Sequence, residues 1–482
     1  MTTRRELIRR LEAAVGPDWV IWRREDLATY EFDGTIEKQT PYAVVLPDTA
    51  EQIAAVVRIS RELSIAITPR GAGTGLSGGA VAVKRGIVVG TARMRKILEI
   101  DPVDRIAVVE PGLPNIQLSE AAAVHGLFYA PDPSSQRACT IGGNVAENAG
   151  GPHCLALGVT TNHVLGIEIV TAEGEIEWLG GRVAETAGYD LRGAFVGSEG
   201  TLGIVTKVIV RLLPVPAEVA TLLASFATVE QASATVSATI AAGMVPAAME
   251  IMDRLTIQAV EESLKAGYPP DAGAVLLVEL DGLPEVVSGQ VTAVRAACLE
   301  NGAVDVRLAR DAAERATLWR GRKEAIGSLG HIAPNYYIVD GVVPRSKLVD
   351  VIGRVGEVSR SSGFPVANVF HAGDGNLHPL ILFDERVAGS TERVLDAAAA
   401  IMQICVEAGG SLSGEHGVGF EKQRFMPWLF SEDDMDNMAR IRAVFGNEGL
   451  FNPCKILPEG TGCGEMGHSA AALRNAGPDA YV

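Results

Sequence analysis

Two of the eight histidines in this chain of 482 residues lie seven positions apart, in the segment HAGDGNLH. His371 and His378 flank a Gly-Asp-Gly-Asn stretch that favours a tight turn, and the apolar runs VANVF and PLILF lie on either side. The pattern predicts a β-hairpin that brings the two imidazoles together. Farther along the chain, Glu415 and His416 stand among glycines in SGEHGVG.

Two imidazoles and one carboxylate form a metal-ligand set that leaves coordination positions open. His371, His378 and Glu415 are therefore candidate ligands for zinc, manganese or iron(II), and we expect zinc or manganese. The alternative is a turn whose polar side chains satisfy only its own backbone. The glycines around these residues, in place of bulky packing residues, favour the metal site.

Three glycine-rich clusters occur in the first half: RGAGTGLSGGA (70–80), PDPSSQRACTIGGNVAENAGG (131–151) and VGSEGTLGIVT (196–206). The first contains G-x-G-x-x-G, but only about seven residues follow Gly79 before the next apolar run, too few for the helix of a Rossmann unit. No G-K-[ST] follows, so a P-loop is excluded as well. The clusters predict loops whose bare backbone N–H groups contact a large polyphosphate ligand at several points.

The elements around these loops are readable from the hydrophobic pattern. Residues 42–69 predict a strand, a helix capped by Thr49 and Gln52, and a second strand. Further strands are expected at 86–90, 105–112 and 164–171, and Pro214 and Pro216 mark a boundary. Beyond them the pattern β-α-β-β-α-β predicts a ferredoxin-like sheet, followed by strands within 366–383 and helices at 391–408 and 432–446.

Composition limits the class of protein. Hydrophobic residues make up 47% and charged residues 21%, as in ordinary globular proteins. A net charge of −17 argues against nucleic-acid binding and against anionic membranes. The start MTTRRELIRRLEAAVG lacks the apolar run of a signal peptide, and no segment reaches the roughly 18 apolar residues of a membrane span. We expect a cytoplasmic protein, attached at most peripherally to the inner face of the cell membrane.

The three glycine clusters resemble the FAD-binding domain of the vanillyl-alcohol-oxidase-like flavoproteins, the PCMH type. In that family the first loop holds the FAD pyrophosphate, the second lines the isoalloxazine and ribityl chain, and the third contacts the cofactor from a strand. The resemblance implies non-covalent FAD; His153 is the nearest candidate for a covalent link. The implied cofactor-binding residues are Arg70, Gly71, Ala72, Gly73, Thr74, Gly75, Leu76, Ser77, Pro131, Asp132, Ser135, Ile141, Gly142, Gly143, Asn144, Gly203, Ile204 and Val205.

HAGDGNLH and SGEHGVG resemble the motifs of the FAD-linked oxidase C-terminal domain. That domain occurs in D-lactate dehydrogenases, D-2-hydroxyglutarate dehydrogenases and the large flavin subunit of glycolate oxidase. The resemblance implies His371, His378 and Glu415 as metal ligands, His416 as the catalytic base and Asn376 as a hydrogen-bond partner of the substrate.

The two resemblances together run from about residue 38 to 458. They imply an α+β fold, with a PCMH-type FAD-binding domain of two subdomains, a ferredoxin-like cap domain for the substrate, and a C-terminal helical segment. The expected division is an N-terminal helical segment (1–37), the FAD domain (38–216), the cap and metal domain (217–458) and a tail (459–482).

A cation must also hold the substrate carboxylate. LWRGRKEA (318–325) resembles the family's arginine-bearing helix, which implies Arg322, with Arg320 as second choice; solvated surface charges are the alternative. Tyr336 and Tyr337 in PNYYIVDG are further candidates. Ile338 stands where 2-hydroxyglutarate dehydrogenases carry a lysine, which favours a short monocarboxylate over the dicarboxylate.

The resemblance thus implies FAD-dependent oxidation of glycolate or D-lactate, with the hydroxyl proton taken by His416 and a hydride passed to flavin N5. D-2-hydroxyglutarate is the second candidate substrate. A non-redox metal hydrolase, a silent assembly subunit and an alkyl-glycerone-phosphate synthase are the competing functions.

The electrons are expected to leave to a partner. The six cysteines are scattered and include no C-x-x-C, so no iron–sulfur ligand set is apparent. The resemblance implies a second flavin-type subunit and an iron–sulfur subunit. A quinone or an electron-transfer flavoprotein is the alternative acceptor, and a homodimer is the alternative assembly.

Overall fold

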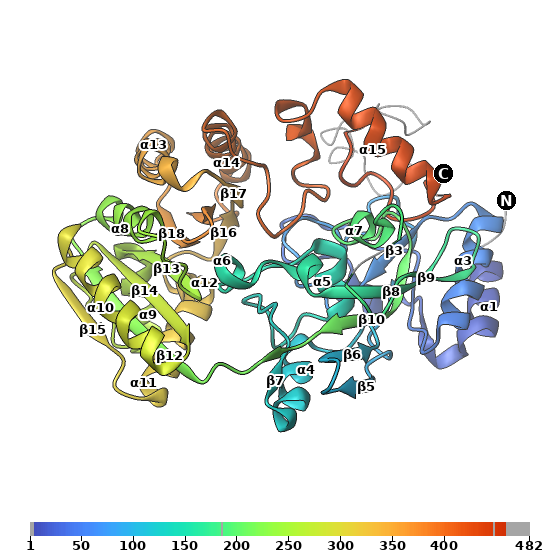
Figure 1. Cartoon of the computed structure of the whole chain (residues 1–482). Coiled ribbons are helices and arrows are strands. Elements are labelled where there is room, and N and C mark those ends of the chain that lie inside the picture. Colours follow the sequence, from blue (N-terminus) through green and yellow to red (C-terminus); the bar gives the residue numbers. More distant parts are fainter. Residues whose placement is uncertain (1–3, 185–186, 447–448, 459–482) are drawn as a thin grey trace.

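The chain folds into two lobes that lie side by side (Figure 1). The computed structural model describes residues 4–184, 187–446 and 449–458. We call residues 4–214 the first lobe and residues 218–412 the cap lobe. The tail expected at 459–482 lies outside the described residues. Helices and sheets are mixed in both lobes, which confirms the predicted α+β class.

The first lobe begins with a four-stranded sheet in the order β1-β2-β4-β3. Its strands are β1 (Val20–Ile21), β2 (Ala43–Val45), β3 (Ile67–Arg70) and β4 (Ile87–Gly90), and the helices beside them are α1 (Arg4–Val15), α2 (Arg24–Leu27) and α3 (Ala50–Leu63). The side chain of Thr49 caps α3 as predicted, accepting from the Gln52 backbone N–H at 3.2 Å. Strands β3 and β4 run parallel, and residues 71–86 between them form neither helix nor strand, as expected for the first glycine loop.

A five-stranded antiparallel sheet completes the first lobe, in the order β5-β6-β10-β8-β9. Its strands are β5 (Ile97–Asp101), β6 (Ile106–Val109), β8 (Val164–Val170), β9 (Ile176–Gly180) and β10 (Ile204–Arg211); β7 (Leu127–Phe128) pairs separately with β11 (Leu213–Pro214). The associated helices are α4 (Asn115–Ala122), α5 (Ile141–Glu147), α6 (Cys154–Leu157) and α7 (Leu191–Phe195). Ile141 and Val145 bury α5 against this sheet, so the second glycine cluster is anchored to a rigid element.

The cap lobe contains the predicted ferredoxin-like sheet. Strands β12 (Glu218–Phe226), β13 (Ala248–Asp253), β14 (Ala274–Gly282) and β15 (Asp305–Leu308) are antiparallel in the order β15-β12-β14-β13. Helices α8 (Val229–Ala241) and α10 (Pro284–Glu300) are the two crossovers that the pattern predicts. An additional helix, α9 (Arg254–Ser263), follows β13 and was not predicted.

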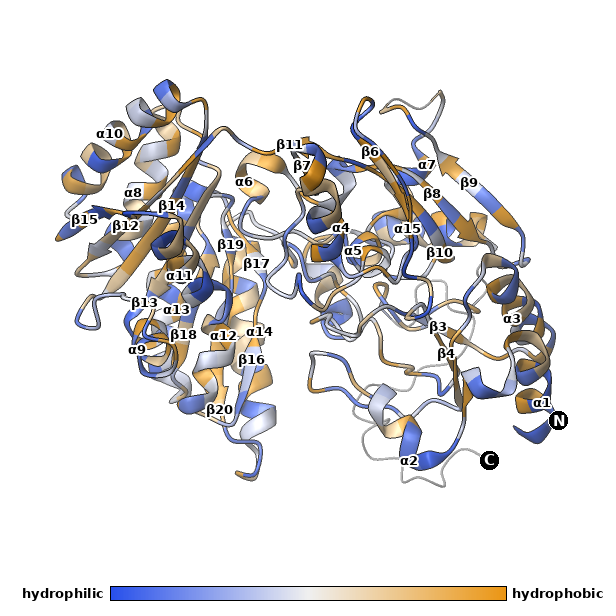
Figure 2. Cartoon of the chain, turned by 90° about the horizontal axis from the view of Figure 1, so that it is seen from below, coloured by the Kyte–Doolittle hydropathy of each residue, from blue (hydrophilic) through white to orange (hydrophobic). Residues whose placement is uncertain are grey.

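The sheet of the cap lobe is covered on both faces. Leu222 and Ala224 point to the face packed by α8, α10, α13 (Leu348–Ser362) and α14 (Ser390–Glu407). Leu223 points to the other face, which α9, α11 (Ala312–Lys323) and α12 (Ala325–Ser328) cover. Figure 2 shows that the strands of both lobes are predominantly apolar. Among the described helices, none combines the length and the apolar content required to cross a bilayer.

The predicted hairpin extends this sheet. It consists of β18 (Val366–His371), β19 (Asn376–Leu377) and β20 (Pro379–Phe383), with β16 (Asn335–Ile338) beside β20 and β17 (Gly341–Val342) beside β19. Strand β18 also pairs with β13, so the hairpin is fixed in the middle of the lobe. After α15 (Glu432–Val444) the chain returns to the first lobe, where Ile67 donates its N–H to the Leu450 carbonyl at 2.7 Å.

Candidate active site

The predicted ligand residues lie together beside the hairpin. His371 ends β18, His378 stands between β19 and β20, and their ring centroids are 5.1 Å apart. Glu415 Oε1 lies 3.1 Å from His371 Nε2 and 3.5 Å from His378 Nε2. One ligand atom from each of the three residues lies within 4.8 Å of the others. This spacing is compatible with one cation between them.

A buried carboxylate behind His371 was missed by the sequence analysis. Glu250 is the cross-strand neighbour of His371, has no exposed surface, and places Oε1 2.8 Å from His371 Nδ1. A carboxylate in this place fixes the ring orientation and leaves Nε2 for a metal. Arg322 Nη2 lies 2.5 Å from Glu250 Oε2, so the buried negative charge is compensated.

A second unpredicted carboxylate, Asp340, holds the loop 413–419 (SGEHGVG), which we call the EHG loop. It is fully buried, and its Oδ2 accepts hydrogen bonds from the Ser413 hydroxyl at 2.6 Å and the His416 backbone N–H at 3.1 Å. Lys422 Nζ lies 2.9 Å from the same oxygen. Burial alone would raise the pKa of Asp340, but His416 and Lys422 hold that pKa well below its ordinary range. Asp340 therefore acts as a fixed anion that orders the loop.

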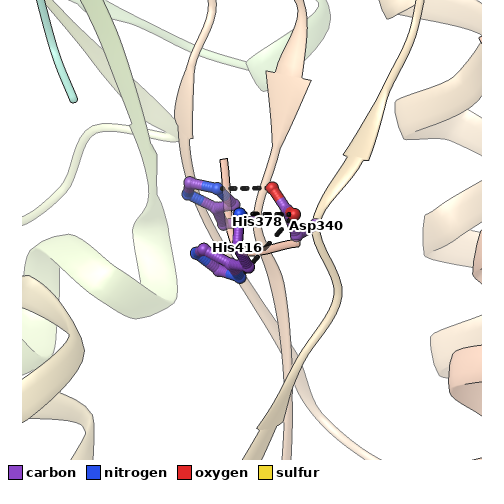
Figure 3. A group of neighbouring side chains, drawn as sticks. All are labelled: Asp340, His378 and His416. Atoms are coloured by element: carbon purple, nitrogen blue, oxygen red, sulfur yellow. Dashed lines mark hydrogen bonds and ion pairs between the residues drawn. The ribbon is translucent and has the colours of Figure 1, made fainter. Parts of the chain in front are cut away.

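Asp340, His378 and His416 form a second group of close ligand atoms (Figure 3). The rings of His378 and His416 stack with centroids 4.9 Å apart, and His378 Nε2 lies 3.4 Å from Asp340 Oδ1. Because Asp340 already accepts several protein hydrogen bonds, its oxygens are less available to a cation than those of Glu415. The contacts favour His371, His378 and Glu415 as the cation site, with His416 beside it.

The donor atoms fit a divalent cation. Among the described residues, His378 Nε2 and His416 Nδ1 are buried nitrogens that form no hydrogen bond and lie only at ion-pair distance from Asp340, 3.4 and 3.8 Å. Buried nitrogens of this kind cost free energy unless a ligand satisfies them. Burial would raise the pKa of Glu415, but His371 and its neighbours lower that pKa to about 2, so the carboxylate is ionised. Burial lowers the pKa of His416 to about 4, so its ring is neutral at neutral pH and can accept a proton.

The described residues enclose a cavity of about 310 Å³ where the two lobes meet. His378 of the cap lobe lines it together with Glu415 and His416 of the segment that follows this lobe, and all three glycine clusters line it from the first lobe. The predicted cofactor residues that line it are Arg70, Gly71, Ala72, Gly73, Thr74, Gly75, Leu76, Ser135, Gly142, Gly143, Asn144, Gly203, Ile204 and Val205. The structure thus brings together loops that are separated by more than a hundred residues.

Four predicted cofactor residues, Ser77, Pro131, Asp132 and Ile141, do not line this cavity. Pro131 instead contributes to the framework of the second cluster through Asn115, which the sequence analysis missed. The Asn115 amide donates to the Pro131 carbonyl at 2.9 Å and to Asn144 Oδ1 at 2.8 Å.

The glycines allow close approach of the loop backbones. A Cβ on Gly71 would lie 2.5 Å from Thr140 Oγ1, and a Cβ on Gly142 would lie 2.6 Å from the Pro111 side chain. Bare backbone at these positions therefore forms part of the cavity wall, as binding of a pyrophosphate requires. The residues present fit FAD in this respect.

The predicted substrate residues are divided between different places. Arg322 lines the cavity together with Lys323, which was not predicted. Arg320 pairs with Glu324 at 3.5 Å and its side chain is 60% exposed, away from the cavity lining. Asn376 is buried beside the EHG loop, its Oδ1 without a hydrogen-bond partner among the described residues, and it does not line the cavity.

The two predicted tyrosines also lie elsewhere. Tyr336 and Tyr337 line a separate, small cavity with Ile338, in which the Tyr337 hydroxyl donates to Glu421. The structure therefore places Arg322 in the wall of the cavity between the lobes, and it places neither of these tyrosines there.

Two carboxylates in the cavity wall, the buried Glu199 and the partly buried Glu147, were not predicted. Glu147 and Glu199 both line the cavity, and burial raises the pKa of each above its ordinary value. Glu199 Oε1 accepts a hydrogen bond from the Val418 N–H at 2.7 Å, which ties the EHG loop to the first lobe. Both carboxylates lie within the glycine clusters, where the glycines themselves are the stronger sequence signal.

Comparison with known proteins identifies the class. Residues 41–180 match the family model described as FAD binding domain, and residues 215–456 match FAD linked oxidases, C-terminal domain. A solved structure of p-cresol methylhydroxylase with substrate bound superimposes with a TM-score of 0.79, covering 92% of this chain and 95% of that chain at 19% identity. This similarity confirms the PCMH-type fold. The molecule is an FAD-dependent oxidoreductase.

Similarity to curated proteins narrows the assignment. The chain is 47% identical over 444 residues to the glycolate oxidase subunit GlcD of Escherichia coli (strain K12), covering 92% of this chain and 89% of that protein. It is 32% identical over 428 residues to D-lactate dehydrogenase of Anaerostipes hadrus, covering 87% of this chain and 90% of that protein. The chain belongs to the FAD-linked oxidase family.

Proposed function

We propose that this protein oxidises a short D-2-hydroxy acid, glycolate or D-lactate, to the 2-oxo acid in an FAD-dependent and metal-assisted reaction. The observation that carries the proposal is the cavity shared by three glycine loops and by His378, Glu415 and His416. The relatives of this protein are named for glycolate and D-lactate, and these names support the proposal that it acts on the CH–OH group of hydroxy acids.

The proposed reaction divides the work between bound groups and side chains. When bound, FAD would supply the acceptor for two electrons and the α-hydrogen, and a divalent cation held by His371, His378 and Glu415 would supply positive charge against the oxygens of the acid. His416 would take the hydroxyl proton, since its buried ring is neutral at neutral pH. Asp340 fixes the backbone of His416 and so would keep the base in place.

The cavity supports a monocarboxylate as substrate. Arg322 and Lys323 supply positive charge in the wall, but the Arg322 guanidinium is already paired with Glu250, so Lys323 is the accessible cation and serves one carboxylate. Ile338, at the position where we place the lysine of 2-hydroxyglutarate dehydrogenases, is outside this cavity. Residue 338 therefore does not select between substrates in this cavity, and D-2-hydroxyglutarate is the second candidate substrate.

We propose that the electrons leave to a partner protein. The name of the Escherichia coli relative describes a subunit, which supports an assembly of several chains. A second flavin-type subunit and an iron–sulfur subunit are the partners we propose for this chain.

Steady-state assays with an artificial dye as electron acceptor test the proposal. Glycolate, D-lactate, L-lactate and D-2-hydroxyglutarate are compared before and after treatment with a chelator and readdition of zinc or manganese. We expect turnover of glycolate or D-lactate that the chelator abolishes and a metal restores. Turnover restricted to D-2-hydroxyglutarate would reassign the substrate, and turnover unaffected by complete metal removal would contradict the role of the cation.

A further inference from the structure

A row of charged side chains crosses the boundary between the lobes beside the cavity. His153 of the first lobe lies between two carboxylates: its Nδ1 is 3.0 Å from Asp132 Oδ2 and its Nε2 is 3.0 Å from Glu279 Oε1 of the cap lobe. The ring stacks on Trp319 with centroids 5.6 Å apart. Burial would lower the pKa of His153, but the two carboxylates raise it to about 10, so the ring is charged at neutral pH.

This row of charged side chains ends at a lysine in the cavity wall. Lys323 Nζ lies 3.3 Å from Asp132 Oδ2, and the side chain is 31% exposed. Lys323 lines the same cavity as Glu415 and His416. A lysine ammonium has three N–H donors, so one contact with Asp132 leaves donors for a ligand.

The neighbouring arginine is placed differently. Arg322 is 2% exposed, and its Nη2 lies 2.5 Å from Glu250 Oε2 and 3.4 Å from His371 Nδ1. Its position is fixed by the residues that hold the metal ligand. Of the two cations, Lys323 has the more accessible charge.

We infer that Lys323 binds the carboxylate of the substrate and that His153, acting through Asp132, positions Lys323 for this contact. The inference rests on the proposed function and extends it to a specificity-determining cation. A 2-hydroxy acid that directed its hydroxyl and one carboxylate oxygen toward a cation held by His371, His378 and Glu415 would retain a second carboxylate oxygen, and Lys323 would donate to that oxygen. Because Glu279 and Lys323 belong to the cap lobe while Asp132 and His153 belong to the first, the contact also requires the two lobes to be docked.

The decisive variant is Lys323→Met in the FAD-loaded enzyme, with Lys323→Arg as the conservative variant and Lys207→Met as the matched control. Lys207 is also a half-exposed lysine paired with a carboxylate, at 2.9 Å from Glu168, but it does not line the cavity. Loss of one charge-assisted hydrogen bond is expected to raise the KM for glycolate or D-lactate about 10- to 100-fold while kcat changes little. Lys323→Arg should recover most of the loss, and Lys207→Met should match the wild type.

A binding measurement separates recognition from turnover. Calorimetric titration with oxalate, an unreactive carboxylate, should show the same loss of affinity in Lys323→Met, with FAD content and metal content unchanged. An unchanged KM and an unchanged oxalate affinity would overturn the inference. A wild-type enzyme that turns over none of the hydroxy acids would instead refute the proposed function.

The role of His153 is tested by combining substitutions. His153→Gln should raise the KM for the acid, but in the Lys323→Met background it should add nothing, because both changes remove the same contact. Additive effects in the double variant, or a His153→Gln enzyme with unchanged KM, would show that His153 only joins the lobes and would overturn its positioning role.

Discussion

Substitution of Glu250 by Gln tests the framework behind the proposed metal site. Glu250 is fully buried and holds His371 Nδ1 at 2.8 Å and Arg322 Nη2 at 2.5 Å, so Glu250→Gln removes the charge that compensates Arg322 at this contact. Breaking a buried ion pair costs about 3–5 kcal/mol of folding stability, and we expect the lower end because glutamine retains one acceptor. Loss of such a partner behind a ligating histidine lowers metal affinity about 10- to 100-fold.

Two measurements check this prediction: urea unfolding for stability, and competition with a chromophoric chelator for zinc affinity. Glu168→Gln is the control, because Glu168 is another buried carboxylate paired with a lysine, and it lies in β8 away from the proposed metal ligands. The control should lose some stability but bind zinc like the wild type. Unchanged zinc affinity in Glu250→Gln, with a folded protein, would refute the reasoning about His371.

Three further substitutions have defined outcomes. His416→Ala should lower kcat about 10²- to 10⁴-fold while the flavin absorbance remains, and a kcat within a factor of about two of wild type would rule out its role as base. Gly71→Ala should yield folded protein with reduced FAD content, measured by the ratio of visible to ultraviolet absorbance, because its Cβ would lie 2.5 Å from Thr140 Oγ1; full FAD content would contradict the close packing of the loops. His153 has a pKa raised to about 10 in the folded state, so its contribution to stability is complete below its ordinary pKa near 6.5 and is lost as pH rises toward 10. Denaturation between about pH 6 and pH 10 should therefore show a steeper loss of stability in wild type than in His153→Gln, and equal slopes would contradict the charged state.

Local sequence signals predicted much of the framework. The hairpin followed from turn-forming residues between two apolar runs, and the order of β12 to β15 followed from alternating strand and helix patterns. The cap of α3 was likewise visible, because Thr49 and Gln52 stand where a helix begins. Helix α9 was missed because its short amphipathic pattern directly follows a strand, and Asp253, whose side chain caps the helix by accepting from the Thr256 N–H at 2.9 Å, is also the last residue of that strand.

The unpredicted site residues owe their roles to contacts between distant segments. Glu250 lies 121 positions from His371, and Asp340 lies 82 positions from Lys422, so spacing within a motif could not reveal either pair. Each is nevertheless a carboxylate in a mostly apolar stretch, Glu250 within β13 (AMEIMD) and Asp340 between β16 and β17 (YIVDGVV), where an ionised group needs a partner. That signal could have identified both.

The grouping of the substrate candidates depended on helix geometry. Arg320 and Arg322 lie two positions apart on α11, and residues at that spacing point in different directions. Arg322 accordingly reaches Glu250 inside the lobe, whereas Arg320 faces solvent. Sequence alone could name the helix but not its buried side.

The most direct test of the central claim is an anaerobic titration of the purified, FAD-containing protein with glycolate, D-lactate, L-lactate and D-2-hydroxyglutarate, following the visible flavin band. The account predicts that glycolate or D-lactate bleaches the band at one equivalent per flavin, that a chelator prevents the bleaching, and that zinc or manganese restores it. A flavin that none of these acids reduces would contradict the proposed function, and bleaching that survives complete metal removal would contradict the proposed role of His371, His378 and Glu415.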